Sequence, residues 1–431
     1  MKSIFDEEIL PKFKRLTKNI KTDVLIIGAG LTGLITAYLL RCNGIKCTVV
    51  EAKRVMSGVS VNSTAKLTLL HGAVYHKIMK RYGLETAKKY FELNEKSVKR
   101  LSDIAKKADC DFLKSDAVLY SISNTKLLEA ELTALKKCGC NDAYFSDKLE
   151  LDFKNAGGIV LPNQAQFNPK KLAKYLLNDI EIYENTRITS ISNSFAFTDT
   201  HKIYAPKIIV CTHFPIMRLS GLYAIKMHQS RSHVLMLKDV SVYDKMYISA
   251  DEGGYSFRQY DDMMLISGAG HRTGEKMNYA KKLREFAANH YEGARPYREW
   301  ATQDCITLDN MPYVGRISRS MKNVYVATGY NKWGMSSSMA AASVLCDMIL
   351  LKPNDYANIL NPSRTIMHKR LIGNIGHSLK GLLTPTAPRC SHLGCALKWN
   401  KYEHSWDCSC HGSRFDFIGN VLDDPANRKL K

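Results

Sequence analysis

The sequence predicts an α/β protein built from a Rossmann-like nucleotide-binding domain, a mixed-sheet domain and a small C-terminal module. Three observations support this fold class. A glycine-rich turn lies between a buried strand and a helix near the start of the chain. Strand-like and helical stretches alternate through the middle of the chain. Four of the 12 cysteines fall within the last 42 residues, where histidines accompany them.

Composition excludes several classes of protein. The chain has 431 residues, of which 45% are hydrophobic and 24% charged, as in folded globular proteins. No run of about 18 apolar residues is present, so we expect no membrane-spanning helix. The first 16 residues mix acids with bases and lack the apolar stretch of a secretory signal, so we expect a cytoplasmic protein. Twelve cysteines are too few to staple a chain of this length with disulfides.

The chain is basic, because 62 Lys and Arg residues against 41 Asp and Glu residues give a net charge of +21. The lysines are dispersed among acids, which favours a solvated surface over a nucleic-acid groove. No recognised nucleic-acid-binding motif accompanies them, so we expect no nucleic-acid partner. The positive net charge therefore indicates at most an acidic protein partner.

Residues 23–51 predict a βαβ unit. Residues 23–27 are apolar and β-branched, which is typical of a buried parallel strand, and they lead into Gly28-Ala29-Gly30-Leu31-Thr32-Gly33 and a helix. The first glycine permits a tight turn, the second lets the backbone approach a pyrophosphate, and the third lets the helix pack closely. Glu51 ends a second strand, where an acid would bind a ribose hydroxyl. The unit predicts a dinucleotide site, with a chance glycine-rich turn as the alternative.

Helices and strands are also expected beyond this unit. Residues 84–108 carry apolar side chains at helical spacing opposite Lys and Glu, as in an amphipathic helix. Further helices are expected at residues 127–137 and 339–351, and strands at residues 117–120, 207–210, 233–236, 263–266 and 323–327. Residues 323–351 repeat the strand–glycine–helix pattern of the start, which predicts one sheet built from separated segments. Gly and Pro punctuate residues 361–388 as in a linker, although residues 364–382 look helical.

The loop after Glu51 favours FAD over NAD, because it is rich in small and hydroxyl side chains and begins with Lys53 and Arg54. From here the chain resembles the D-amino-acid-oxidase-like flavoproteins, through residues 207–215, 309–316 and 326–336. The resemblance spans about residues 20–350. It implies a glutathione-reductase-like FAD-binding domain, FAD bound in an extended conformation, and a mixed-sheet domain that covers the flavin ring.

The same resemblance implies the cofactor contacts and the mode of binding. The expected contacts are Gly28, Gly30, Leu31, Thr32, Gly33, Glu51, Ala52, Arg54, Ser63, Thr64, Ala65, Thr212, Gly329, Lys332, Trp333 and Gly334. Cys305 misses the position at which relatives attach the flavin, so we predict non-covalent FAD.

The C-terminal cysteines and histidines form two loops, Cys390-Ser391-His392-Leu393-Gly394-Cys395 and Cys408-Ser409-Cys410-His411-Gly412-Ser413. Each loop offers one Cys and one His to a [2Fe–2S] cluster with thiolates on one iron and imidazoles on the other. A Cys₂His₂ zinc site is the alternative.

The pattern of the two loops resembles a Rieske protein. The resemblance implies Cys390, His392, Cys408 and His411 as ligands and a disulfide between Cys395 and Cys410. Few residues precede the first loop, so we expect an abbreviated module that docks on the rest of the chain because it is too small to fold alone.

The resemblance also indicates candidate substrate residues. Amino-acid-handling relatives often place an arginine for the substrate carboxylate where this chain has Asp304. An acid there favours an amine over a free α-amino acid. Arg258 and Lys66 are alternative anion contacts, each also interpretable as a surface or flavin-phosphate cation. His213 and His271 are interpreted as structural histidines rather than general bases.

Together these features predict an FAD-dependent amine or amino-acid oxidoreductase. Electrons would pass from the flavin through the cluster to a one-electron acceptor protein or a quinone. A redox-sensing or electron-relay protein without a metabolite substrate is the alternative. We expect an oxidoreductase at residues 1–365, with FAD-binding segments at about 20–85, 150–220 and 305–360 and a substrate domain at about 86–149 and 221–304. A linker at residues 366–386 and the Rieske-type segment at residues 387–431 would follow.

Overall fold

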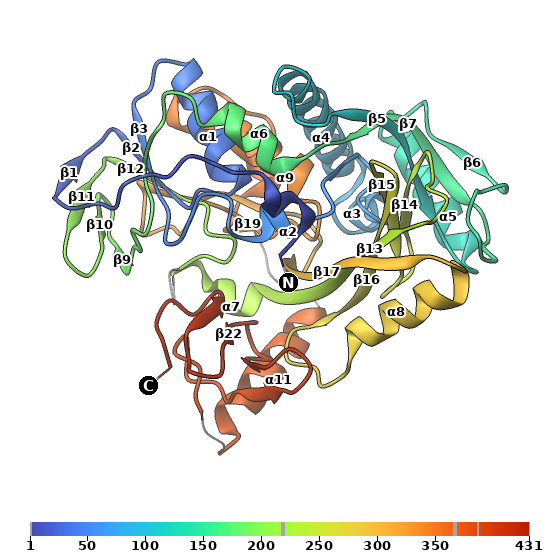
Figure 1. Cartoon of the computed structure of the whole chain (residues 1–431). Coiled ribbons are helices and arrows are strands. Elements are labelled where there is room, and N and C mark those ends of the chain that lie inside the picture. Colours follow the sequence, from blue (N-terminus) through green and yellow to red (C-terminus); the bar gives the residue numbers. More distant parts are fainter. Residues whose placement is uncertain (1, 217–219, 365–368, 386–387, 431) are drawn as a thin grey trace.

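The computed structural model describes residues 2–216, 220–364, 369–385 and 388–430, whose strands form four sheets (Figure 1). The predicted βαβ unit is confirmed. Its strands and helix are β2 (Val24–Ile27), α1 (Leu31–Cys42) and β3 (Cys47–Val50), and both strands are buried along their length. Continuous burial explains why these strands are apolar throughout rather than alternating.

A six-stranded sheet contains the unit, in the order β18–β19–β12–β2–β3–β8. Its further strands are β8 (Glu181–Tyr183), β12 (Lys207–Val210), β18 (Tyr313–Arg316) and β19 (Val324–Thr328). All pairs are parallel except β18 with β19. The strands come from distant parts of the chain, as the repeated strand–glycine–helix pattern predicts. Because β19, β12, β2 and β3 are parallel neighbours, the loops after them meet at one edge of the sheet, where α/β proteins bind ligands.

A nine-stranded mixed sheet forms the second layer, in the order β17–β13–β16–β15–β14–β5–β7–β4, with β6 also paired to β7. The strands are β4 (Lys66–Leu67), β5 (Leu113–Tyr120), β6 (Tyr144–Ser146), β7 (Gly158–Gln166), β13 (Met227–Lys238), β14 (Met246–Ser249), β15 (Ser256–Tyr260), β16 (Met263–Arg272) and β17 (Arg295–Thr307). β14 and β5 are parallel and the other pairs antiparallel. β4 and β7 belong to this sheet although they fall outside the ranges expected for the substrate domain.

Helices cover both sheets, and a small sheet lies at one edge. The helices are α2 (Val59–Asn62), α3 (Tyr75–Tyr82), α4 (Leu84–Ala105), α5 (Thr125–Lys137), α6 (Pro169–Leu176), α7 (Tyr223–Lys226), α8 (Tyr279–His290), α9 (Gly334–Ile349) and α10 (Ala357–Leu360). The small sheet has the order β1–β11–β10–β9, from β1 (Ile20–Lys21), β9 (Ser190–Ile191), β10 (Phe195–Phe197) and β11 (Lys202–Tyr204). Short 3₁₀ turns lie at Ile4–Glu7 and Ser220–Leu222.

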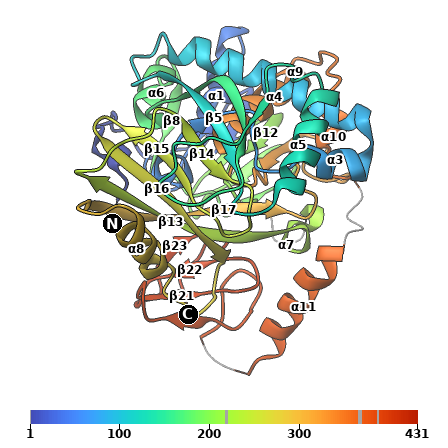
Figure 2. The ribbon, with the colours of Figure 1, turned by 90° about the vertical axis from the view of Figure 1, so that its right-hand side faces the viewer.

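The C-terminal module lies under β13 and β17 (Figures 1 and 2). It contains an antiparallel sheet of β20 (Lys398–Asn400), β21 (Ser405–Asp407), β22 (Arg414–Phe415) and β23 (Val421–Asp423). Its core holds Cys390, Cys395, Leu397, Cys408, Cys410, Phe415 and Ala426. The module therefore has strands between and after its two loops, which is more than the two loops and short tail expected from the sequence.

The predicted linker is largely a helix, α11 (Lys369–Leu383), beside this module. The expected linker ends at residues 366 and 386 lie outside the described residues. No helix within the described ranges is long and apolar enough to cross a bilayer.

Candidate functional site

The glycine turn after β2 has the tight geometry that the fingerprint requires. Gly28 has φ +105°, and a Cβ there would lie 2.5 Å from the carbonyl oxygen of Cys211. A Cβ on Gly33 would lie 2.0 Å from the carbonyl oxygen of Gly28, so only glycine lets α1 approach the turn. The N-terminus of α1 lies at this edge of the six-stranded sheet, where the N–H groups of a first helical turn can bind an anion. The first of them, that of Leu31, donates to the Ser60 hydroxyl at 3.1 Å.

Glu51 is held at the same edge by the backbone. Its carboxylate accepts hydrogen bonds from the N–H groups of Ala29 at 2.9 Å and Lys53 at 2.8 Å. Burial raises the pKa of Glu51, and these two hydrogen bonds act against that rise. A carboxylate fixed in this way beside the glycine turn fits the binding of a ribose hydroxyl.

A cavity of about 930 Å³ extends from the glycine turn to β13, β16 and β17. Most of the predicted FAD contacts line it, although they come from four distant segments. Those residues are Gly28, Gly30, Leu31, Thr32, Glu51, Ala52, Ser63, Thr64, Ala65, Thr212, Gly329, Lys332, Trp333 and Gly334. The glycine cradle, the acid and the size of the cavity fit a bound dinucleotide.

Three predicted site residues do not line this cavity. Gly33 packs α1 against the turn, as described above. Arg54 pairs with Glu184 at 3.0 Å and donates to the carbonyl of Pro11 at 3.3 Å. Arg258 is buried and donates to the carbonyls of Thr64 at 2.6 Å and Ala65 at 3.2 Å. Arg258 thus supports a loop of the cavity wall, and its role as a substrate contact stays a prediction.

Asp304, Lys66 and Lys332 do line the cavity. Burial raises the pKa of Asp304, and Lys332 partly offsets this effect. Burial and the nearby Arg258 lower the pKa of Lys66 to about 7, and its ammonium donates to Thr64 and Ser256. Lys332 donates to the Ser232 hydroxyl at 3.0 Å. These three side chains therefore offer one acid and two amines to a ligand in the cavity.

Sequence reasoning missed His71, which lines the cavity and stacks on Trp333 with a centroid distance of 5.2 Å. Its ring nitrogens lie 2.9 Å from the Tyr90 hydroxyl and 2.7 Å from the Ser336 hydroxyl. Burial lowers the pKa of His71 to about 3, so the ring is neutral and positions Trp333. No local signal could have identified it, because Ser336 lies 265 residues away in sequence.

The two histidines interpreted as structural both have partners. His271 lies in β16, where Nδ1 is 2.9 Å from the carbonyl oxygen of Ala269. His213 lines the cavity, and its Nδ1 lies 3.3 Å from Asp424 and 3.8 Å from the Cys305 sulfur. Burial opposes a charge on His213, but Cys305 and Asp424 raise its pKa well above the ordinary value.

The two predicted histidine ligands lie together, one from each C-terminal loop. The rings of His392 and His411 lie edge to face with centroids 5.0 Å apart. His411 Nδ1 is buried and has no hydrogen-bond partner among the described residues. A buried polar atom without a partner is expected where it coordinates a metal ion. Hydrogen bonds from the thiols of Cys390 and Cys395 hold the pKa of Cys408 well below its usual range, which favours the thiolate.

A tetrahedral Zn²⁺ holds its donors at about 2.0–2.3 Å, so the donors lie within about 4 Å of one another. Within the described part of the chain, Cys395, Cys408 and Cys410 form the one group of three or more possible ligands whose donor atoms all lie within 4.8 Å. This group contains one predicted ligand, Cys408, and the predicted disulfide pair, and it is not the Cys₂His₂ set of the zinc alternative.

Cys395 and Cys410 lie within 4.8 Å of each other, and both are free thiols here. Their proximity makes a disulfide feasible, and the pairing stays a prediction. Cys138 and Cys140 are buried in the main core of the oxidoreductase body.

The cluster loops are docked on the large sheet through short contacts. Gln303 of β17 donates to the carbonyl of Gly412 at 2.8 Å, and a Cβ on Gly412 would lie 2.5 Å from the Gln229 Cβ. Arg272 of β16 donates to the carbonyls of Ser409 and Cys410, each at 3.1 Å. The module is therefore bound to the body through the loop that carries two of its predicted ligands.

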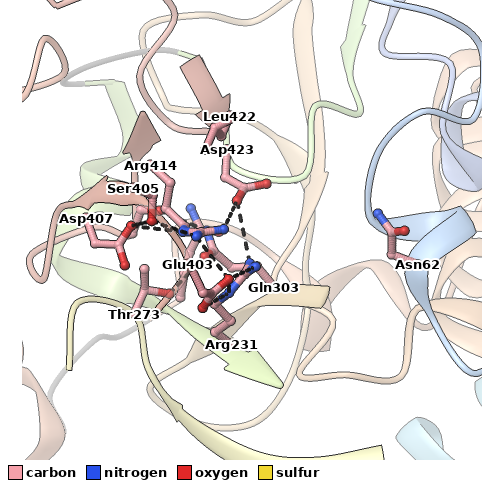
Figure 3. A network of polar contacts seen from close by, with 12 residues as sticks. Asn62, Arg231, Thr273, Gln303, Glu403, Ser405, Asp407, Arg414, Leu422 and Asp423 are labelled. Carbon is pink, nitrogen blue, oxygen red and sulfur yellow. Dashed lines mark hydrogen bonds and ion pairs between the residues drawn. The ribbon is translucent and has the colours of Figure 1, made fainter. Parts of the chain in front are cut away.

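A buried ion network strengthens this interface (Figure 3). Arg231 of β13 donates to both Glu403 carboxylate oxygens, at 2.8 and 2.9 Å from Nε. Arg414 donates to Glu403 at 3.0 Å and to Asp407 at 2.9 Å. Burial alone would raise the pKa of Glu403, but Arg231 and Arg414 lower it to about 2.

The cavity and the cluster loops share a wall. Phe214, which follows the cavity residues Thr212 and His213, packs edge to face on His392 with centroids 6.1 Å apart. Residues 421–427 of the C-terminal module also line the cavity. Lys53, next to the predicted ribose site, donates to the carbonyl of Leu422 at 3.1 Å.

Comparison with known families agrees with this division of the chain. The FAD dependent oxidoreductase (DAO) family model matches residues 23–348, and the Rieske [2Fe-2S] domain model matches residues 367–431. A Bacillus subtilis (strain 168) protein named as a Rieske 2Fe-2S iron-sulfur protein, YhfW, is 33% identical over 98% of this chain and 95% of its own length. The gamma-glutamylputrescine oxidoreductase of Escherichia coli (strain K12) is 23% identical over 78% of this chain and 85% of its own.

Solved structures show the same fold for the main body. Glycine oxidase from Geobacillus kaustophilus superposes with a TM-score of 0.67 at 15% identity, covering 80% of this chain and 99% of that chain. L-proline dehydrogenase from P. horikoshii gives a TM-score of 0.67 at 14% identity, covering 81% and 98%.

Proposed function

The chain belongs to the FAD-dependent oxidoreductase (DAO) family and carries a C-terminal Rieske [2Fe-2S] domain. On this premise we propose that it oxidises a C–N bond of an amine or amino acid and passes the electrons through the cluster to an external acceptor. The names of its relatives support this substrate class. One is a gamma-glutamylputrescine oxidoreductase, and two structural neighbours are a glycine oxidase and an L-proline dehydrogenase.

The observation that carries the proposal is the wall shared by the cavity and the cluster loops. Phe214 joins the cavity residue His213 to the predicted ligand His392. Gln303 lines the cavity and donates to Gly412, the residue after the predicted ligand His411. Each predicted histidine ligand thus lies next to the cavity wall, which suits electron transfer between the two sites.

One set of residues would bind FAD and another would bind the cluster. When bound, FAD accepts two electrons at once from a C–N substrate, and a Rieske cluster carries them singly. Gly28, Gly30 and the N-terminus of α1 would hold the pyrophosphate, and Glu51 the ribose. Two thiolates, from Cys390 and Cys408, and two imidazoles, from His392 and His411, would hold the cluster.

Asp304 supports an amine as the substrate. Its carboxylate lines the cavity and would pair with a substrate ammonium group. The raised pKa of Asp304 suits it to take the proton from that ammonium, because oxidation of the C–N bond requires a neutral amine. Lys66 and Lys332 would contact an anionic group of the substrate if it carries one.

A redox-sensing or electron-relay protein without a metabolite substrate is the second candidate. Such a protein would also transfer electrons across the wall shared by the cavity and the cluster loops, but it would not need an acid in the cavity to bind an amine. Anaerobic titration with pooled amines and amino acids separates the two, because only an oxidoreductase with a metabolite substrate bleaches its flavin absorbance in this mixture.

The proposed electron route, from the flavin through the cluster to an external acceptor, is tested with Cys408→Ala. The variant should keep substrate-driven flavin bleaching and lose the reduction of a one-electron acceptor such as ferricyanide, together with the cluster's electron paramagnetic resonance signal. Cys42→Ala is the matched control, because this exposed thiol lies outside both sites. Acceptor reduction at the wild-type rate in Cys408→Ala would contradict the proposed electron route.

A further inference from the structure

Helix α11 turns its aliphatic side chains outward. The aliphatic stripe consists of Ile372, Ile375, Leu379, Leu382 and Leu383, all of which are exposed. Ile372 is 77% exposed, Leu379 53% and Leu383 79%. Asn374 and Gly381, by contrast, are buried against the protein. An ordinary surface helix shows the opposite arrangement, because burying its apolar side chains stabilises the fold.

Specific contacts fix this orientation of α11. Asn374 donates to the carbonyl of Ile225 at 3.2 Å and accepts from Arg272 at 2.9 Å. A Cβ on Gly381 would lie 2.2 Å from the Cys410 sulfur, so only glycine allows the helix to approach the cluster loop. The Cys410 thiol donates to the carbonyl of His377 at 3.4 Å. The helix cannot rotate its stripe inward without losing these contacts.

The stripe runs along the whole helix. At about 100° per residue, its five members fall within an arc of about 100° on one side of α11. Figure 2 shows α11 at the periphery of the molecule, beside the C-terminal module. A Cβ placed on Gly373 or Gly376 would meet no atom within 4 Å, so neighbouring positions of the helix are open as well.

The surroundings of the stripe are basic. Seven Lys and Arg residues and no Asp or Glu occur between Asp355 and Glu403, although one of the seven, Arg364, is buried against Asp309. The exposed Arg389 donates to the carbonyls of Leu382 at 3.1 Å and Thr384 at 2.7 Å, which places its charge at the C-terminal end of the stripe. Burial lowers the pKa of His377, and the charges of Arg272, Lys398 and Lys380 add to this effect while Glu275 opposes it. Three cations and one acid therefore lie near the middle of the helix.

We propose that α11 lies in the surface of an anionic lipid membrane, with the aliphatic stripe at the acyl boundary and the flanking cations among the headgroups. Short helices that join an apolar stripe to Lys and Arg bind membranes in this way. A membrane surface is flat, so it can contact the exposed side of α11 along its whole length. This favours a lipid surface over an acidic protein as the partner. Because the helix is about 10 Å thick and covers Cys410, binding holds the cluster loop close to the membrane.

Vesicle flotation of the full-length holoprotein tests this inference and needs no substrate. The protein should float with phosphatidylglycerol vesicles at low salt, float less at high salt, and stay unbound with phosphatidylcholine vesicles. Ile372→Glu combined with Leu383→Glu should lower the bound-to-free ratio by about tenfold or more, because two apolar side chains leave the lipid. Leu351→Glu is the matched control at an equally exposed position, 83% accessible, outside α11 and should leave binding unchanged.

Flavin and cluster absorbance, compared across the variants, shows that each is folded. The proposal is overturned if no vesicle binds the wild-type protein, or if Leu351→Glu reduces binding as much as the double variant. It is also overturned if light scattering shows a wild-type dimer that the double variant splits, since a second copy would then cover the stripe. Loss of membrane binding leaves anaerobic flavin bleaching untouched, so this test and that of the proposed function fail independently.

Discussion

Replacing Glu403 by Gln should weaken the attachment of the C-terminal module to the oxidoreductase body. The substitution preserves shape but removes the negative charge shared by Arg231 and Arg414. Both arginines are at least nine-tenths buried, with side-chain exposures of 10% and 5%. Arg231 would keep Asp423, at 3.6 Å, and Arg414 would keep Asp407 and Asp423. Removing one partner of a buried ion pair costs about 3–5 kcal/mol, and these remaining partners favour the lower end of that range.

The pKa of Glu403 gives a second estimate of how much this carboxylate stabilises the folded module. It is lowered from 4.5 to about 2. Since one pKa unit corresponds to about 1.4 kcal/mol, the ionised carboxylate stabilises the folded module by about 3 kcal/mol at neutral pH. Because the folded-state pKa is the lower one, this stabilisation is complete above about pH 4.5 and is lost as the pH falls towards 2.

Urea unfolding followed by two signals measures the effect. Visible circular dichroism of the cluster reports on the module, and flavin fluorescence reports on the body. Glu403→Gln should lower the unfolding free energy of the module by about 3 kcal/mol at pH 7, and the difference from wild type should shrink between pH 5 and pH 3. Glu150→Gln, which removes the exposed pair with Lys245, should cost less than about 1 kcal/mol.

The reasoning is refuted if Glu403→Gln costs no more than Glu150→Gln at pH 7. It is also refuted if the loss at pH 3 equals that at pH 7, since the carboxylate charge would then not be its cause.

Three further outcomes follow from the geometry of the cavity. Gly33→Ala should yield protein with little flavin, by visible absorbance, because its Cβ would lie 2.0 Å from a carbonyl oxygen, whereas Gly376→Ala should retain flavin. Because the pKa of Lys66 is about 7, binding of acetate, followed by the flavin spectrum, should weaken as the pH rises through 7, and Lys66→Met should remove that dependence. Asp424→Asn should lower the pKa of His213 in histidine-selective NMR, and an unchanged value would show that Asp424 does not raise it.

The contiguous motifs of this protein were predictable from the sequence. The turn from Gly28 to Gly33 and the two Cys–His loops each place their chemistry within six residues, so local backbone geometry determines them. The buried strands and amphipathic helices followed from hydrophobic periodicity for the same reason. Family membership and both cofactors follow from these local patterns.

Side chains whose partners are distant in sequence were not predictable. The contact of Arg258 with the carbonyl of Thr64, 194 residues away, had no signal in the sequence. His71 escaped notice because its partner Ser336 lies 265 residues away. A long polar side chain can satisfy its hydrogen bonds in many ways, and only packing selects one of them.

The amino-acid sequence alone thus determined which cofactors the chain can hold, because a glycine turn and paired Cys–His loops work through neighbouring residues. Only the tertiary structure decided how the two sites meet, through Phe214 on His392 and Arg231 on Glu403. It also decided that α11 turns leucine and isoleucine outward, because the Gly381 contact with Cys410 sets the rotation of that helix. These contacts join segments that no periodicity relates.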